Sequence, residues 1–329
     1  MMSVNASKTK VAFSLGAGVV AALSQRPHRR AGRRRTWIAP LVLLAPTAIV
    51  LILVVGYPLL QLVINSFQDF GLRALFTGQT AWIGFANYTG IFADPLFWPV
   101  LLRTFGFTAS LVIGSVVIGM FFSELLIRLG TMMRTIFSFV MIIAWALPTV
   151  ASTLVWQWQF QPLYGVLNWV ITQIGWFGNF TSHSWTSTPG EAFLIVWLLI
   201  VWQAVPFVAF SLYAGQSQIP EECYEAAMLD GAGLWQIYRS VTLPFLTPVL
   251  YLVTILSIIW DFNVFNQLWI LTQGGPSGGT TTLGIWSFQK AFASNSFGQG
   301  SAIAIVTTII LMVVTSFYIR RLIRSGEGL

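Results

Sequence analysis

Charged side chains are scarce in this chain of 329 residues, because Asp, Glu, Lys and Arg together make up only 8% of it. A soluble domain carries about 25% of such residues, so a soluble fold of this length could not cover its surface. Hydrophobic residues make up 56%, and several apolar runs reach the roughly 20 residues that a membrane-spanning helix needs. The composition therefore predicts an integral membrane protein and disfavours a soluble protein with an unusually apolar core.

Cysteine and histidine are nearly absent. The one cysteine, Cys223, excludes an internal disulfide and a metal site built from several cysteines. The two histidines, His28 and His183, lie far apart and show no ligand spacing. The stretch "GGPSGG" lacks the Lys-Ser/Thr pair of a phosphate-binding loop. We therefore expect no metal, no catalytic residue and no ATP-binding motif on this chain, which argues against a membrane enzyme.

Six apolar runs predict six membrane-spanning helices and an all-α fold. Polar connections rich in Gly, Pro and Ser separate these runs. A basic tail, residues 1–36, precedes the first run, and the membrane domain is expected to cover residues 37–325. The runs occupy residues 37–64, 99–127, 134–160, 191–215, 246–272 and 300–319.

The basic residues predict the orientation of the chain. With the N-terminus inside, 14 of the 17 Lys and Arg residues fall in inner segments, and Arg73, Arg103 and Lys290 fall outside. This positive-inside bias predicts that both termini are cytoplasmic. We interpret the basic stretch "RPHRRAGRRR" as an orientation signal and a contact with anionic lipid, not as a nucleic-acid site. The short apolar run at residues 11–23 is similar to a signal-peptide core, but we interpret it as part of the cytoplasmic tail.

The longest inner loop, residues 216–245, is predicted to form a helix-turn-helix. Pro220 can open a helix whose first turn holds two glutamates, and Asp230-Gly231 supplies a break. The following stretch then places several apolar residues on one helical face, namely Leu234, Ile237, Tyr238 and Val241. The pattern is typical of a docking element at the inner membrane surface, but a loop that lies passively on the bilayer has the same pattern.

This loop carries a spaced motif. In "EAAMLDGAGLWQIYRSVTLP" (residues 225–244), a Glu-Ala-Ala triplet, a glycine and a Leu-Pro pair stand at the spacing of the EAA loop. The EAA loop marks the permease subunits of binding-protein-dependent ABC importers, and this chain resembles such a subunit. The one departure is Val241 in place of isoleucine, which is a conservative change.

The resemblance covers nearly the whole chain from about residue 37 onward. The stretches "YPLLQLVINSF", "IGFANY" and "LTQGGP" are similar to those of the carbohydrate-uptake group of these importers, the maltose type. The Gly-Gly-Pro element and "FASNSFGQGSAIAI" resemble the larger of the two permease subunits in that group, in its six-span form.

The resemblance implies a function and a set of partners. The chain would form, with a second permease subunit, the pathway for ATP-driven uptake of a sugar or small oligosaccharide across a bacterial-type cytoplasmic membrane. Two ATP-binding cassette subunits would dock below and hold ATP-Mg, so this chain would bind no cofactor itself. An extracytoplasmic sugar-binding protein would deliver the solute.

The resemblance also implies roles for residues of the loop. Glu225 would pair with a basic group of the ATPase, while Ala226 and Ala227 would allow close approach. Gly231 would let the chain turn tightly. The complete set of expected coupling residues is Glu225, Ala226, Ala227, Asp230, Gly231, Leu243 and Pro244.

Asp261 is the only acidic residue well inside a predicted span, and such residues default to functional hypotheses. One helical face combines it with other groups suited to a sugar, at positions i, i+3, i+4 and i+7: Ser257, Trp260, Asp261 and Val264. The fourth span offers Gln203 and Phe207 beside Pro206, which can kink a helix. By motif register, Gln203, Phe207, Ser257, Trp260 and Asp261 fall at the sugar-contacting positions of maltose-type permeases.

Other readings of these residues remain open. Asp261 and the nearby amides could instead hydrogen-bond across the helix bundle and hold it together. Asn263 and Asn266 fall on other faces of a continuous helix and are weaker candidates. Because the pathway segments carry no Lys or Arg, we expect a neutral sugar rather than a phosphorylated solute such as glycerol phosphate. A secondary transporter is the less favoured alternative, because it would need no EAA loop.

Overall fold

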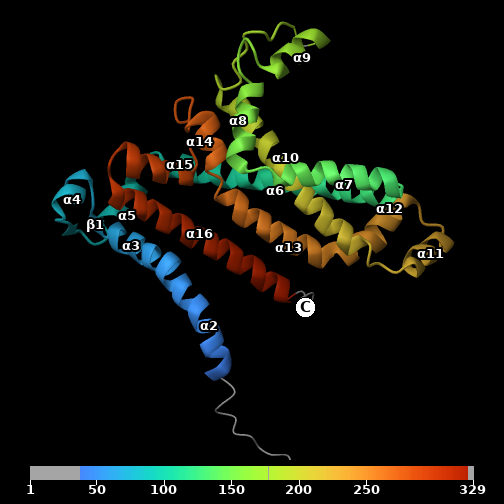
Figure 1. Cartoon of the computed structure of the whole chain (residues 1–329), viewed down its shortest axis with the longest axis horizontal. Helices are drawn as coiled ribbons and strands as arrows, with labels where there is room; N and C mark the ends of the chain where they lie inside the picture. Colours follow the sequence, from blue (N-terminus) through green and yellow to red (C-terminus); the bar gives the residue numbers. More distant parts are fainter. Residues whose placement is uncertain (1–37, 177, 325–329) are drawn as a thin grey trace, which may run out of the picture. The chain divides into compact units, whose positions relative to one another are not determined.

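The computed structural model describes residues 38–176 and 178–324, and these residues form mainly α-helices (Figure 1). The basic tail of residues 1–36, with its expected contact with anionic lipid, lies outside the described residues. The chain divides into two units, of which the first ends at Leu59 and the second begins at Leu60.

The first unit contains the start of the first candidate span. Helix α2 (Ile38–Leu51) continues through the π-helical turn η1 (Ile52–Gly56) into α3 (Tyr57–Ser66), whose last residues belong to the second unit. The large apolar side chains of α2 and η1, such as those of Leu43 and Val54, are exposed. Such exposure is expected for a helix whose solvent is lipid.

The second unit begins with a small hairpin. Strands β1 (Gln68–Asp69) and β2 (Ala81–Trp82) pair antiparallel, with α4 (Leu72–Thr77) between them and α5 (Ala86–Ala93) after them. The Asn87 side-chain amide donates to the backbone carbonyls of Ser66 (2.9 Å) and Gln68 (3.0 Å). These two bonds fasten α5 to the end of α3 and to strand β1.

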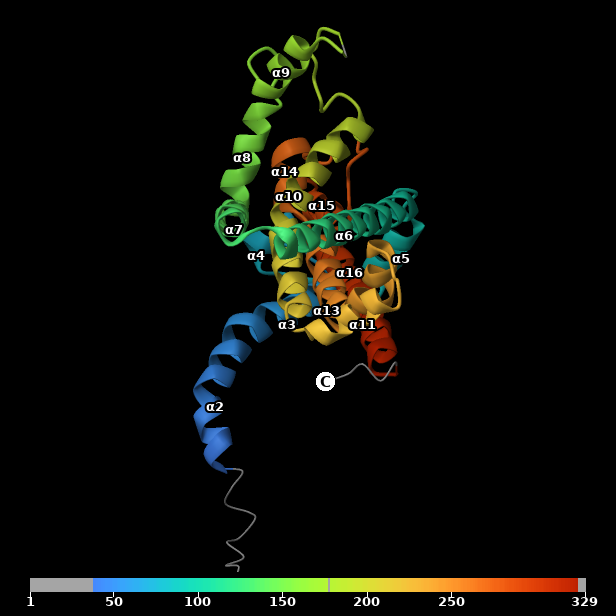
Figure 2. The same ribbon diagram turned by 90° about the vertical axis from the view of Figure 1, so that its right-hand side faces the viewer.

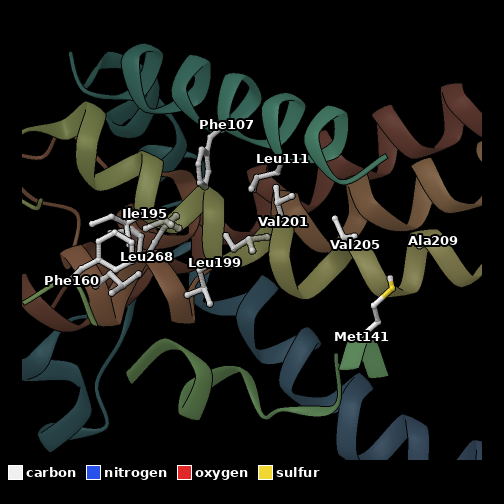
Figure 3. Packing of buried hydrophobic residues seen from close by; sticks show 14 residues of the cluster. Phe107, Leu111, Met141, Phe160, Ile195, Leu199, Val201, Val205, Ala209 and Leu268 are labelled. Carbon is white, nitrogen blue, oxygen red and sulfur yellow. The ribbon is translucent and has the colours of Figure 1, made fainter. Parts of the chain in front are cut away.

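Helices α6 (Phe97–Arg128) and α10 (Pro189–Gln216) form the centre of the second unit. Figure 3 shows Phe107 and Leu111 of α6 beside buried α10 residues in the largest hydrophobic cluster. The start of α10 is set locally, because the Thr188 hydroxyl accepts from the Glu191 N–H (3.4 Å) and donates to the Glu191 carboxylate (3.0 Å). The stretch "TPGE" thus begins the helix with a cap and with proline at its first position.

Two glycines let α6 and α10 approach closely. A Cβ added at Gly119 would lie 2.7 Å from the Cβ of Val208, and one added at Gly114 would meet the Trp197 ring. Small residues at such contacts are how helices pack in a membrane, where no hydrophobic force draws them together. The two α6 glycines therefore leave room for the side chains of Trp197 and Val208 on α10.

The other helices surround this pair. Helix α13 lies between α10 and α16 in both views (Figures 1 and 2), and α16 also packs on α15 and α5. Helix α7 packs on α10, and α8 packs on α14. The bounds of these elements are α7 (Thr131–Ala146), α8 (Thr149–Gln159), α9 (Val166–Ile174), α11 (Glu221–Leu229), α12 (Leu234–Ile237), η2 (Tyr238–Thr242), α13 (Leu243–Phe262), α14 (Asn266–Thr272), α15 (Leu283–Phe288), η3 (Gln289–Ala293) and α16 (Phe297–Arg324).

Within the described residues, five helices are long and apolar enough to cross a membrane, or six if one bent pair is taken as a single span. Four agree with the predicted runs to within a few residues, namely Val42–Ser66, Phe97–Arg128, Pro189–Gln216 and Phe297–Arg320. The other two predicted runs differ from the structure.

The span predicted over residues 134–160 consists of two helices rather than one straight helix, because α7 and α8 meet at an angle of 98°. The bend lies at Leu147-Pro148, where Leu147 has extended backbone (φ −66°, ψ 131°). A residue that precedes proline avoids the helical region because its backbone clashes with the proline ring. The sequence "ALPT" thus ends one helix and starts the next.

The fifth predicted run, residues 246–272, is also divided. Its helix begins earlier, in the inner loop, and continues from Leu234 through η2 to Phe262. It then stops, and α14 starts at Asn266. The Asn263 side chain donates to the Ile259 carbonyl (2.9 Å) and thereby takes one of the free acceptors at the helix end.

The loop between α14 and α15 is held in place by side chains from other elements. The Arg103 guanidinium of α6 donates to the carbonyls of Gly278 and Thr281, both at 2.9 Å. Nearby, Lys290 Nζ lies 3.1 Å from Asp94 Oδ2. The pKa of Asp94 is lowered, chiefly because the Leu96 N–H donates to its carboxylate and further because of Lys290.

We expect Gly119→Ala to destabilise the protein, by about 1–3 kcal/mol in the free energy of unfolding, because the added methyl group overpacks the contact between α6 and α10. The measurement is the unfolding midpoint of the purified protein in mild detergent. Gly106→Ala is the matched control, since Gly106 lies on the same helix and a Cβ there meets nothing within 4 Å. Equal midpoints for both variants would contradict the close packing.

Candidate functional site

A pocket of about 330 Å³ lies between α10 and α13. All five residues that the sequence predicts to contact sugar line it: Gln203, Phe207, Ser257, Trp260 and Asp261. Gln203 and Phe207 come from α10, and the other three come from the last turns of α13. The structure therefore brings together two groups of residues that lie at least 50 positions apart in the chain.

Both helix breaks border this pocket. Leu147 and Thr149 line it from the bend between α7 and α8, and residues 263–267 line it from the break between α13 and α14. Lipid cannot satisfy free backbone N–H and C=O groups. Non-helical backbone at membrane depth is therefore tolerated only where protein buries it or where it lines a polar cavity.

Three aromatic rings form one wall of the pocket. The Phe207 ring is stacked with that of Trp145, with centroids 6.4 Å apart and planes 20° apart. The Trp260 ring meets Phe207 edge-on at 5.2 Å. Both tryptophans are a little more than half exposed, and both line the pocket, so they offer apolar ring surface to a bound molecule. Such surfaces suit the C–H faces of a sugar ring.

Asp261 supplies the pocket with its one acidic group among the described lining residues. The residue is 7% exposed, and no described group donates a hydrogen bond to its buried Oδ2 atom. Among the described residues of α6, the Thr108 hydroxyl donates to the Asp261 backbone carbonyl (3.4 Å) and not to the carboxylate. No described side chain therefore uses this carboxyl group to tie helices together, and the residue lines the pocket.

Three further polar residues line the pocket: Asn263, Asn266 and Gln267. On a continuous helix Asn263 and Asn266 would point to other faces, but the chain leaves the helix after Phe262 and redirects them. Asparagine competes for backbone hydrogen bonds and favours helix ends, so the stretch "DFNVFNQ" carried a sign of the break.

The loop of residues 216–245, which the sequence predicts to be the inner loop, carries the second set of candidate residues. Helix α11 ends in a Schellman motif, in which the Ala232 N–H donates to the Ala227 carbonyl and the Gly231 N–H to the Met228 carbonyl, both at 3.0 Å. Gly231 has φ +79°, a left-handed value that favours glycine. The predicted break at Asp230-Gly231 is thus confirmed as local geometry.

The end of α11 presents a mixed surface. Glu225 and Ala226 are exposed, Met228 is largely exposed, and Leu229 is 89% exposed. We call these four residues the α11 tip. The apolar face predicted for the next helix is only partly buried, because Ile237 is buried whereas Leu234 is exposed. Leu243 and Pro244 begin α13 and are part of the helix that continues from α12.

A polar network fastens the base of this loop. Gln216, the last residue of α10, donates to Glu124 of α6 (2.8 Å), and Arg128 donates to the same carboxylate (2.8 Å). Arg134 of α7 donates to the carbonyls of Leu126 (2.9 Å) and Leu129 (2.8 Å) at the end of α6. The sequence identified Arg128 and Arg134 only as basic inner residues, because their partners depend on the tertiary fold.

Residues 115–326, which include both the pocket and the inner loop, match the family described as "binding-protein-dependent transport system inner membrane component". The chain belongs to this family. The predictions of a multi-pass helical membrane protein and of an ABC-importer permease subunit are thereby confirmed, and this membrane component is distinct from the ATPases of such systems.

Characterised relatives of this permease are similar along most of their length. The diacetylchitobiose uptake system permease protein DasB of Streptomyces coelicolor is 41% identical over 298 residues, which cover 91% of this chain and 90% of the relative. The sulfoquinovosyl glycerol transport system permease protein SmoG of Agrobacterium fabrum is 35% identical and covers 87% and 90%. The resemblance to carbohydrate permeases is therefore confirmed at the level of the whole chain.

A solved structure shares the fold. It is that of a bacterial alginate ABC transporter in complex with an alginate pentasaccharide-bound periplasmic protein. A chain of it superposes with a TM-score of 0.75 at 18% identity, over 90% of this permease and 97% of that chain.

If the break after α13 opens onto a polar pocket, cysteines placed there should react with a membrane-impermeant thiol reagent. We expect Asn263→Cys and Asn266→Cys to be labelled in membranes, in a Cys223→Ser background that removes the one native thiol. Leu268→Cys is the control, because Leu268 is fully buried two positions farther along the same segment. Labelling is measured by mass shift, and labelling of Leu268→Cys as fast as the other two would contradict the pocket.

Proposed function

We propose that this chain is the permease subunit that forms, with a second permease subunit, the pathway for ATP-driven uptake of a sugar or small oligosaccharide. The observation that carries the proposal is the pocket between α10 and α13, where a buried carboxylate faces exposed aromatic rings. The carbohydrate solutes named for the relatives support the same class of substrate.

The pocket residues divide the work of binding a sugar. The Asp261 carboxylate and the Ser257 hydroxyl accept hydrogen bonds from sugar hydroxyls, and the Gln203 amide adds a donor and an acceptor. The rings of Phe207 and Trp260 pack against the C–H face. A site built this way holds a sugar through several modest contacts, which suits a pathway because tight binding would prevent release.

The pocket favours a neutral sugar over an anionic solute such as glycerol phosphate. No Lys, Arg or His is among its described lining residues, and Asp261 would repel a second negative charge. The second permease subunit completes the pathway from the opposite side.

The α11 tip couples the permease to ATP hydrolysis. In this proposal Glu225 pairs with a basic group of an ATP-binding cassette subunit, Ala226 and Ala227 allow close approach, and Asp230-Gly231 sets the turn. Leu243 and Pro244 lie on the helix that leads from the loop into the membrane. Two such ATPase subunits hold ATP-Mg, and this chain binds no cofactor.

A continuous helix joins the loop to the pocket. The run Leu234–Phe262 has no break, so its 29 residues span about 40 Å. It begins beside the α11 tip and ends at Trp260 and Asp261. A movement of the loop when the ATPases close would displace these pocket residues directly, which gives the coupling a rigid element.

The proposal includes an orientation. Both termini and the inner loop face the cytoplasm, as the distribution of Lys and Arg predicts, and the membrane is a bacterial-type cytoplasmic membrane. A sugar-binding protein delivers the solute from the opposite side. The bent pair α7–α8 then serves as one span, which gives six crossings and returns the C-terminus to the side of the N-terminus.

Replacing the pocket carboxylate should impair uptake without preventing assembly. We expect Asp261→Leu to reduce sugar uptake roughly ten- to hundredfold, the loss expected for a hydrogen bond to a charged group. The measurement is uptake of labelled diacetylchitobiose, maltose and trehalose into proteoliposomes that hold the complete transporter and its binding protein. Asp94→Asn removes an acid outside the pocket and should keep uptake; wild-type uptake by Asp261→Leu would overturn the assignment.

Changing the turn after α11 should uncouple the permease from its ATPase. We expect Gly231→Val to lower ATPase co-purification and solute-stimulated ATP hydrolysis, because a left-handed backbone costs a side chain about 1–2 kcal/mol. Gly233→Val is the matched control, since Gly233 has φ −73° and a Cβ has open space at both positions. Loss of function in neither variant, or equally in both, would contradict the role of the turn.

A further inference from the structure

A cavity of about 560 Å³ lies beneath the inner loop. Its walls come from the last turns of α6, the end of α10, and the helices α11 and α12 with η2. A groove of about 330 Å³ between α6 and α12 adjoins it. Glu124, Arg128, Leu234 and Tyr238 line both, so the groove opens into the cavity.

The groove is mainly apolar, and its aromatic side chains are of the kinds found at the boundary between membrane and water. Met120 and Phe121 of α6 face Leu234 and Trp235 across it. Phe121 is 65% exposed and Trp235 is 73% exposed, although both are large apolar side chains. The Trp235 ring is stacked with that of Tyr238 (6.0 Å, 20°). Tryptophan and tyrosine concentrate at the level of lipid headgroups, so the groove is placed where an acyl chain meets its headgroup.

The cavity at the other end of the groove has a largely apolar lining that also carries charged groups with a net negative charge. Its charged lining consists of Arg128 and three glutamates, Glu124, Glu221 and Glu225. Glu124 is already engaged, since one oxygen accepts from Arg128 and the other from Gln216. Glu221 is exposed on the first turn of α11, and Arg128 is about half exposed beyond its contact with Glu124. Arg128 and Glu221 therefore offer one cation and one carboxylate to a ligand in the cavity.

We propose that the groove and cavity bind one inner-leaflet phospholipid with an ethanolamine headgroup. Its acyl chain lies along Met120, Phe121 and Trp235, its phosphate contacts Arg128, and its ammonium donates to the Glu221 carboxylate. The inference rests on the proposed cytoplasmic placement of the loop.

The charge of the cavity selects the headgroup. An anionic headgroup such as glycerol phosphate would add a negative charge beside three carboxylates and bring no cation to offset it. A choline headgroup brings a cation but no N–H donor. A primary ammonium both offsets the charge and hydrogen-bonds a carboxylate, so phosphatidylethanolamine fits the described lining.

The test is lipid retention by the complete transporter. The complex is placed in nanodiscs with equal parts of phosphatidylethanolamine, phosphatidylcholine and phosphatidylglycerol, extracted again in mild detergent, and weighed by native mass spectrometry. We expect phosphatidylethanolamine to be retained over each of the others by roughly three- to fivefold, the ratio that one exposed ion pair supports. Retention of phosphatidylglycerol in preference, equal retention of the three lipids, or no retained lipid would overturn the proposal.

Matched variants locate the lipid. Glu221→Gln should abolish the preference for ethanolamine, whereas Glu222→Gln should keep it, because Glu222 is an exposed neighbour that does not line the cavity. Phe121→Ala should lower total retained lipid, whereas Val117→Ala, one turn away on the same helix and outside the groove, should not. Equal behaviour within either pair would overturn the assignment.

Sugar uptake is measured on the same preparations, which separates the two proposals. If the wild-type transporter takes up sugar but shows no preference for phosphatidylethanolamine, only the lipid proposal is contradicted. A photo-crosslinker at Phe121 that captures an ATPase peptide instead of lipid would also overturn the lipid site, while supporting the docking of the loop.

Discussion

The absence of water in a lipid bilayer governs this structure, because every backbone N–H and C=O at membrane depth must find its partner within the protein. Long helices satisfy that demand automatically. The part of the chain that the structure describes departs from it at Leu147-Pro148 and at residues 263–265, and both departures border the same polar pocket. The place where the fold leaves the helix is therefore also the place where a polar solute can replace the missing hydrogen-bonding partners.

Two parts of the second unit have different roles, namely the closely packed pair α6 and α10 and the long helix Leu234–Phe262. Helices α6 and α10 approach closely at Gly119, where an added Cβ would meet Val208, and the Glu124–Gln216 pair joins their C-terminal ends. The helix Leu234–Phe262 instead joins the inner loop to Trp260 and Asp261 without interruption. A pathway that responds to ATP needs both a helix that can transmit movement and a packed pair of helices against which that movement changes the pocket.

The sequence was informative where local rules decide the structure. The break at Asp230-Gly231 follows from the left-handed turn that glycine permits, and the pocket face of α13 follows from helical periodicity. The sequence did not predict the bends, because the hydrophobicity of an apolar run is the same for a straight helix and for a broken one. Pro148 and Asn263 were signs of the breaks, but membrane helices tolerate such residues in their interior as well. The partners of Arg134 and Glu124 depended on which helix ends meet in space, which no local pattern contains.

The break after Phe262 also bears on how such a permease changes its solute over time. Asn263, Asn266 and Gln267 line the pocket from a segment that is not in register with α13. Inserting or deleting one residue within a helix rotates everything beyond it by about 100°. The same change between Phe262 and Asn266 would reshape the pocket while α13 keeps its face toward α10. A change in the length of this short segment can therefore alter specificity during evolution while the packing of the membrane helices is kept.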